Sequence, residues 1–137
     1  MKRVATMFLL LAVTAGIAHA QDGGVAVELN KLESRGAACR AYLVLENGSG
    51  EGFESLKLDL VLFDREGIVA KRLAVETAPL AAGKTSLSVF DMAGVGCERA
   101  GRLLLNDVAA CAGAAGERTG CLAAITPRTR TDIPFIK

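Results

Sequence analysis

Four cysteines are the residues of this chain best suited to chemistry: Cys39, Cys97, Cys111 and Cys121. A thiol redox centre or a zinc site usually places two cysteines about two residues apart, and no such pair occurs. Cys111 and Cys121 flank a Gly- and Ala-rich segment that can bring its own ends together. Cys39 and Cys97 can meet if the strand ending near Asp91 runs antiparallel beside the strand starting near Cys39. Of the three possible pairings, two structural disulfides, 39–97 and 111–121, are therefore predicted.

The only histidine, His19, lies in a segment with the features of a secretory signal peptide. Lys2-Arg3 precedes an apolar run, residues 4–18, and Ala18-His19-Ala20 is a small-residue ending suited to signal peptidase. Cleavage after Ala20 removes His19, which excludes Ser/His and Cys/His nucleophilic pairs from the mature chain. Because Lys2-Arg3 is not an arginine pair, the general secretion route is predicted. We expect a periplasmic protein, with an extracellular location as the alternative.

Four carboxylates remain as candidates for acid–base catalysis: Asp59, Asp64, Glu66 and Asp91. Asp64 and Glu66 are expected in a turn and Asp59 on a solvent-facing stripe, which favours solvated surface charges. Segment 47–52 is similar to the start of a calcium-binding loop, but position twelve is Leu58 instead of a bidentate Glu. A hairpin loop is the preferred interpretation of this segment. The sequence therefore predicts no catalytic residue, no metal and no cofactor.

Length and charge narrow the number of domains and the classes of partner that remain. Removing 20 of the 137 residues leaves 117, which is the size of one domain. Without Lys2 and Arg3 the chain carries 14 basic and 15 acidic side chains, so neither nucleic acid nor an anionic membrane is expected as a partner. The apolar run is shorter than the ~20 residues of a spanning helix, so no stable membrane insertion is expected after cleavage.

The dominant hydrophobic period is two, which is typical of β-strands. Strands are predicted at residues 25–30, 39–46, 56–63, 68–75, 85–90 and 103–105, the last extending to Val108. Residues 56–63 and 68–75 are expected to form a hairpin around a turn at 64–67. A short helix over residues 102–110 is the alternative for the last strand. The pattern predicts an all-β, immunoglobulin-like antiparallel β-sandwich of six to seven strands, stabilised by disulfides.

The middle of the chain resembles a known family. Residues 53–64, followed by Gly67, Val69 and a loop at 80–85, resemble small bacterial immunoglobulin-like modules of the FxLYD type. The whole chain also resembles uncharacterised exported proteins of alphaproteobacteria that are often labelled as Tat pathway signal sequence domain proteins. The first resemblance implies a sandwich fold and carries over no catalytic residue.

Two classes of function remain for a chain divided into a signal peptide (1–20), a sandwich domain (21–125) and a tail or last strand (126–137). The first is a non-enzymatic binding or accessory module that contacts another periplasmic or envelope protein. Five residues are candidate contacts, from an expected edge strand and from the tail: Lys71, Arg72, Arg128, Arg130 and Phe135. Lys71 and Arg72 can equally be charges that protect an edge, and the tail can equally be folded or disordered. The second class is a small exported enzyme or thiol redox protein that uses carboxylates or cysteines.

Overall fold

The computed structural model describes residues 23–137, so the predicted signal peptide, residues 1–20, lies outside the described part of the chain. Within residues 23–137 the elements are β1 (Val25–Arg35), β2 (Ala38–Asn47), β3 (Ser55–Asp64), β4 (Val69–Glu76), β5 (Thr85–Met92), the 3-10 helix η1 (Cys97–Arg99), β6 (Ala100–Gly113), β7 (Gly116–Glu117), α1 (Cys121–Ala124), β8 (Ile125–Thr129) and β9 (Phe135–Ile136). The strands of five residues or more are β1 to β6 and β8, which matches the predicted number.

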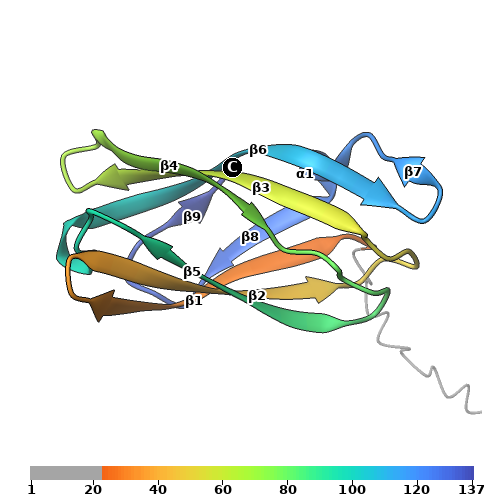
Figure 1. Ribbon diagram of the computed structural model, residues 1–137, viewed down its shortest axis with the longest axis horizontal. Coiled ribbons are helices and arrows are strands. Elements are labelled where there is room, and N and C mark those ends of the chain that lie inside the picture. Colours follow the sequence, from red (N-terminus) through yellow and green to blue (C-terminus); the bar gives the residue numbers. More distant parts are fainter. Residues whose placement is uncertain (1–22) are drawn as a thin grey trace, which may run out of the picture.

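The strands form two sheets that pack face to face. One sheet has the order β5-β2-β1-β8, and the other has the order β4-β3-β6-β7, with β9 also paired to β6. Figure 1 shows β3, β4 and β6 in one layer and β1, β2 and β5 in the other. Because alternate side chains of each strand point to opposite faces, the buried apolar sets of β1 and β2 meet those of β3 and β6 between the two sheets. The predicted immunoglobulin-like β-sandwich is therefore confirmed.

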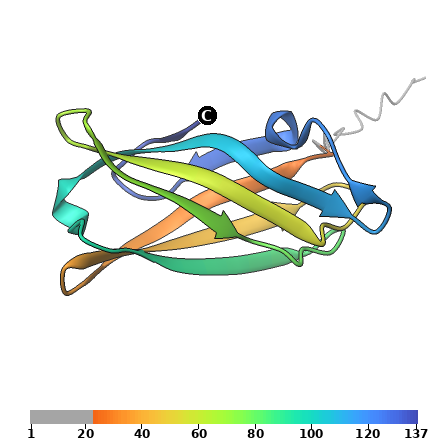
Figure 2. The ribbon, with the colours of Figure 1, turned by 45° about the horizontal axis from the view of Figure 1, so that its top comes forward.

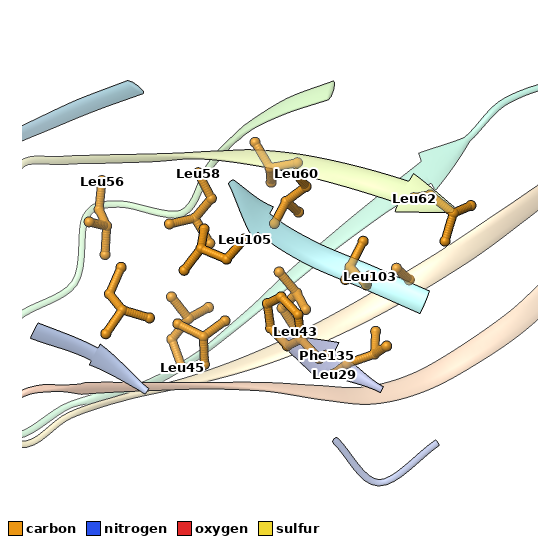
Figure 3. Close-up of a cluster of buried hydrophobic side chains, with 14 of the residues drawn as sticks. Leu29, Leu43, Leu45, Leu56, Leu58, Leu60, Leu62, Leu103, Leu105 and Phe135 are labelled. Atoms are coloured by element: carbon orange, nitrogen blue, oxygen red, sulfur yellow. The ribbon is translucent and has the colours of Figure 1, made fainter. Parts of the chain in front are cut away.

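Leucine side chains fill the space between the sheets (Figure 3). The β3 residues Leu56, Leu58, Leu60 and Leu62 are fully buried, and they face buried leucines of β1 and β2. Burial of each such side chain contributes about 1.5–3 kcal/mol relative to exposure. The period-two leucine pattern of residues 56–62 thus explains both the strand and the side of β3 that is buried.

Strand β6 decides between the two alternatives for residues 102–110. It is a strand of 14 residues, and its register with β3 shifts at three places. Leu103 and Leu105 alternate with Leu104 and Asn106 between the core and the outer face. The helix alternative is wrong because pairing with β3 along the whole strand outweighs the helix propensity of Ala and Leu.

The connection from β2 to β3 crosses between the sheets, so the hairpin interpretation of segment 47–52 is wrong. Asn47, only 1% exposed, holds this connection in place. Its amide nitrogen donates to the carbonyls of Glu51 (2.8 Å) and Ala81 (3.1 Å), and its side-chain oxygen accepts from the Ser49 hydroxyl (2.6 Å). These bonds satisfy a polar group that would be costly to bury alone. The β3–β4 hairpin is confirmed, with Gly67 at a φ of 81° in its turn.

The C-terminal segment folds onto both sheets. Strand β8 pairs in parallel with β1, and β9 pairs in parallel with β6, so residues 130–134 cross from one sheet to the other (Figure 2). Phe135 is only 6% exposed and belongs to the core. Of the three possibilities for the tail, the structure shows the folded one. Phe135, a candidate contact of the tail, does not lie on the surface, because the crossing turns its side chain into the sandwich.

Both predicted disulfides are present. Cys39 is bonded to Cys97 and Cys111 to Cys121. Cys39 lies opposite Met92 in the β2–β5 register, and the chain then turns back at η1 to bring Cys97 against it. None of the cysteines in residues 23–137 is free. Two such bonds are typical of an oxidising compartment outside the cytoplasm.

A candidate protein-binding face

Strand β4 is an edge strand, as the sequence predicts, and its two cations protect that edge. Lys71 pairs with Leu62 in the β3–β4 register, so it shares the core-facing side of the strand. A charge that points inward on an edge strand opposes the addition of another strand. Arg72 lies on the outer side and is held by Asp59, with the Nε–Oδ1 and Nη2–Oδ2 distances both 2.9 Å. Lys71 and Arg72 therefore have positions that suit the protection of the β4 edge.

Asp59 does not lie on a solvent-facing stripe, contrary to the sequence-based expectation. It is only 7% exposed, because Arg72 of β4 and Asn106 of β6 cover it from either side. Asn106 donates its amide to Oδ2 at 2.7 Å. Hydrogen bonds from Arg72 and then from Asn106 hold the pKa of Asp59 below its usual value. The carboxylate thus links β4, β3 and β6 through its hydrogen bonds to Arg72 and Asn106.

The other candidate carboxylates are engaged separately from Asp59. Asp64 accepts hydrogen bonds from the backbone N–H groups of Glu66 (3.0 Å) and Ile68 (2.9 Å), which closes the hairpin turn. Asp91 lies in the other sheet, where Arg40 forms a bidentate pair with it at 2.7 and 3.0 Å. Within residues 23–137 no group of three or more Cys, His, Asp or Glu side chains has an arrangement that could hold a metal ion.

Strand β8 forms the edge of its sheet beyond β1, and it is protected as well. It has five residues and contains Pro127, which cannot donate to an added strand. Arg128 lies opposite Glu28 in the register and 3.9 Å from Glu46, measured from Nη1 to Oε2. Arg130 Nε contacts Glu28 Oε1 at 3.0 Å. The two predicted contact arginines therefore lie in ion pairs on the outer face of the β5-β2-β1-β8 sheet.

Strand β5, at the opposite edge of that sheet, lacks such protection. All eight of its residues pair with β2 in one register, and the strand contains no Pro, Lys or Arg. Leu87 and Val89 are 59% and 44% exposed, while Ser86, Ser88 and Phe90 face the interior side. The sequence predicts this strand at residues 85–90, but the exposure of Leu87 and Val89 was not predicted. One feature could have indicated this exposure. Cys39 of β2 lies opposite the buried Met92 at the end of β5, and this register places the even-numbered residues of β5 on the inward side.

The exposed Leu87 and Val89 form a cluster with two half-buried neighbours on β2, and we call these four residues the outer patch: Tyr42, Val44, Leu87 and Val89. In the β2–β5 register Val44 lies opposite Leu87 and Tyr42 opposite Val89, so all four share the outer face. Cross-strand neighbours of this kind are about 5 Å apart. The other large exposed apolar side chains of residues 23–137 lie at the β3–β4 turn or on β9: Ile68, Val69 and Ile136.

Charged pairs surround the outer patch. At one end is the Arg40–Asp91 pair, in which the arginine lowers the pKa of Asp91. The Tyr42 hydroxyl donates a hydrogen bond to Glu33 and lowers the pKa of that carboxyl. The Lys31 ammonium lies 5.2 Å from the centroid of the Tyr42 ring. An apolar centre with a charged rim is the usual composition of a protein–protein interface.

A cleft of about 640 Å³ lies at the loop end of the sandwich, between segments 51–54, 79–81 and 113–118. The Arg118 guanidinium stacks on Phe53 at 4.4 Å and forms an ion pair with Glu51 at 3.0 Å. Because Glu51 already neutralises Arg118, the cleft has no free cation with which to hold an anionic ligand. The outer patch is the stronger candidate for binding.

Comparison with known proteins gives the fold and nothing finer. No protein-family model matches the chain, and no curated protein matches it. The solved structure of IrmA from Escherichia coli is similar, with a TM-score of 0.58 and 19% sequence identity over 76% of this chain and 90% of that one. This likeness supports the sandwich architecture. In the part of the chain that the structure describes, no helix is long and apolar enough to cross a membrane.

Proposed function

We propose that this protein is a non-enzymatic binding module of the periplasm that contacts another periplasmic or envelope protein through the outer patch. The observation that carries the proposal is the exposure of Leu87 and Val89 on an edge strand without a proline or a cation, whose one charged residue, Asp91, is paired with Arg40. Exposed apolar clusters rimmed by polar groups mark interaction sites on otherwise ordinary surfaces.

The patch offers both affinity and orientation to a partner. Tyr42 is an amphipathic aromatic side chain of the kind enriched in the energetic centres of interfaces. The Arg40–Asp91, Arg128–Glu46 and Arg130–Glu28 pairs surround it with both signs of charge. Charges at the rim of an interface steer and orient a partner more than they add to affinity.

The test is affinity capture of the tagged protein from its own periplasm after mild crosslinking in the cell, followed by mass spectrometry. Leu87→Lys places a charge in the centre of the patch without touching the core. Ala74→Lys, at an exposed position of the edge strand β4, is the matched control. We expect one partner that is lost with Leu87→Lys and kept with Ala74→Lys. Equal recovery with both variants would overturn the proposal.

A further inference from the structure

The free edge of β5 has a definite set of open backbone groups. Asn47 N–H donates to the Lys84 carbonyl at 2.9 Å, so position 84 is directed at β2. In an antiparallel ladder, residues directed at the partner strand alternate with residues directed away from it. Ser86, Ser88 and Phe90 are therefore bonded to β2. Four residues direct their N–H and C=O groups to the open edge: Thr85, Leu87, Val89 and Asp91.

This edge is a template for another strand. It extends over eight residues paired in one register, whereas β4 has an inward lysine and β8 has a proline. A long, regular edge with apolar side chains and its one charge at the end, Asp91, pairs readily with other chains unless something covers it. Among the edge strands β4, β5 and β8, β5 is therefore the one best suited to pair with a further strand.

We propose that the partner at this edge is the β5 strand of a second copy of the chain, paired antiparallel about a two-fold axis through Ser88. In this register Leu87 of each copy lies opposite Val89 of the other, and Thr85 lies opposite Asp91. All four open residues of each copy then form hydrogen-bonded pairs, which gives eight backbone hydrogen bonds from the geometry of the ladder.

Charge complementarity favours the second copy and the antiparallel direction. Strand β5 begins beside a cation, Lys84, and ends with an anion, Asp91, whose carboxylate binds Arg40 of its own copy and remains 43% exposed. Antiparallel pairing brings the cation of each copy close to the anion of the other, twice in one dimer. Parallel pairing would place like charges together, which is unfavourable. Two-fold pairing also closes the assembly, because each β5 edge is used once.

The dimer deepens the proposed function and rests on it, because it builds a larger version of the same surface. The two four-stranded sheets join into one sheet with the order β8-β1-β2-β5-β5-β2-β1-β8. The two outer patches then become continuous across the axis, with Leu87 of one copy beside Val89 of the other. A partner protein would meet this combined surface and not a single patch.

A cysteine placed on the axis tests the register directly. Two Ser88→Cys side chains would face each other in a non-hydrogen-bonded pair with a Cα–Cα distance of about 4.5 Å, which suits a disulfide. Ser86→Cys is the matched control: the same substitution on the same side of the strand leaves the two thiols about 13 Å apart. We expect a covalent dimer from Ser88→Cys alone under a mild thiol–disulfide buffer. Crosslinking of Ser86→Cys, or of neither variant, would overturn the proposed pairing.

A proline at position 89 tests the backbone contribution. Val89→Pro removes an outward N–H without removing a bond to β2, and Val89→Ala removes the side chain but keeps the N–H. Sedimentation velocity over the micromolar range should show a dimer for the natural protein and for Val89→Ala. Two lost hydrogen bonds per dimer, at about fivefold each, should raise the dissociation constant of Val89→Pro about 25-fold above that of Val89→Ala. Circular dichroism confirms that both variants are folded, and a monomeric natural protein would refute the inference.

The dimer and the proposed function can fail separately. A monomer whose partner is still lost with Leu87→Lys would reject self-pairing and retain the proposed function. A dimer that captures its partner equally with Leu87→Lys and Ala74→Lys would reject the outer patch as the contact with another protein and retain self-pairing.

Discussion

Replacing Phe135 by alanine tests whether the C-terminal segment is part of the folded core. Phe135 lies two residues before the last residue of the sequence, on a strand of two residues, and it is only 6% exposed. Its backbone pairs with Leu103 of β6, and its ring lies among the core leucines (Figure 3). If this short strand is anchored mainly by the aromatic ring, the substitution should destabilise the whole sandwich and not only the last residues.

The magnitude follows from the buried area. Removing about 150 Å² of buried aromatic surface at about 25 cal/mol per Å² costs about 4 kcal/mol, within the range of about 3–5 kcal/mol known for such substitutions. For a domain of this size the loss corresponds to a fall in Tm of about 15 °C. Urea unfolding followed by circular dichroism, with the disulfides intact, measures it.

The neighbouring residue provides the control. Ile136 is 38% exposed and lies on the same strand, so Ile136→Ala should cost about 1 kcal/mol or less. Equal and small losses for the two variants would refute the assignment of Phe135 to the core. They would also reopen the segment as an exposed contact.

The remaining predictions concern the disulfides and the buried carboxylate. Replacing both cysteines of the 39–97 bond by alanine should lower the free energy of unfolding by about 4 kcal/mol, because the bond closes a sequence separation of 58. For the 111–121 bond, with a separation of 10, the loss should be about 3 kcal/mol. Urea unfolding measures both losses. Asp59→Ala should cost about 2 kcal/mol in the same assay, because it leaves the donors of Arg72 and Asn106 without their acceptor, and a loss below about 0.5 kcal/mol would contradict that account. Acid should destabilise the protein, because two carboxyl groups have lowered pKa values in the folded state. The pKa of Asp59 lies below its usual 3.8. The pKa of Glu76 lies below 4.5, because hydrogen bonds from Leu56, Ala78, Ser55 and Thr77 outweigh the effect of its burial. Stability is therefore fully present above about pH 5 and is lost as pH falls through the folded pKa values, and unfolding free energies that rise on acidification would refute this.

The disulfide pattern shows how much of the structure residue spacing alone can predict. The 111–121 bond was predictable because a short flexible segment joins its two ends. The 39–97 bond was predictable because it needs only one assumption, that two strands lie side by side in antiparallel order, and the register of Cys39 against Met92 confirms that assumption. The helix alternative for residues 102–110 could not be excluded, since Ala-rich segments suit either structure until a neighbouring strand is known.

The surface was much less predictable than the core. Thr85, Leu87 and Val89 alternate with Ser86, Ser88 and Phe90, and both sets contain apolar residues. Local periodicity reports that one face differs from the other, but it does not report which face is covered. The choice depends on β2, which lies about forty residues earlier in the chain and sets the orientation of β5 through their register.

Sequence alone therefore determined the features that depend on local pattern: the strands β1 to β6, the turn between β3 and β4, the apolar faces of residues 25–29 and 56–62, and the residues that pair as disulfides. Tertiary structure decided the features that depend on contacts between distant segments. It turned Phe135 inward through the crossing from β8 to β9, covered Asp59 with Arg72 and Asn106, and left Leu87 and Val89 exposed at an unprotected edge. The physical reason is that a side chain is buried only where another segment covers it, and the local sequence does not specify which distant segment that is.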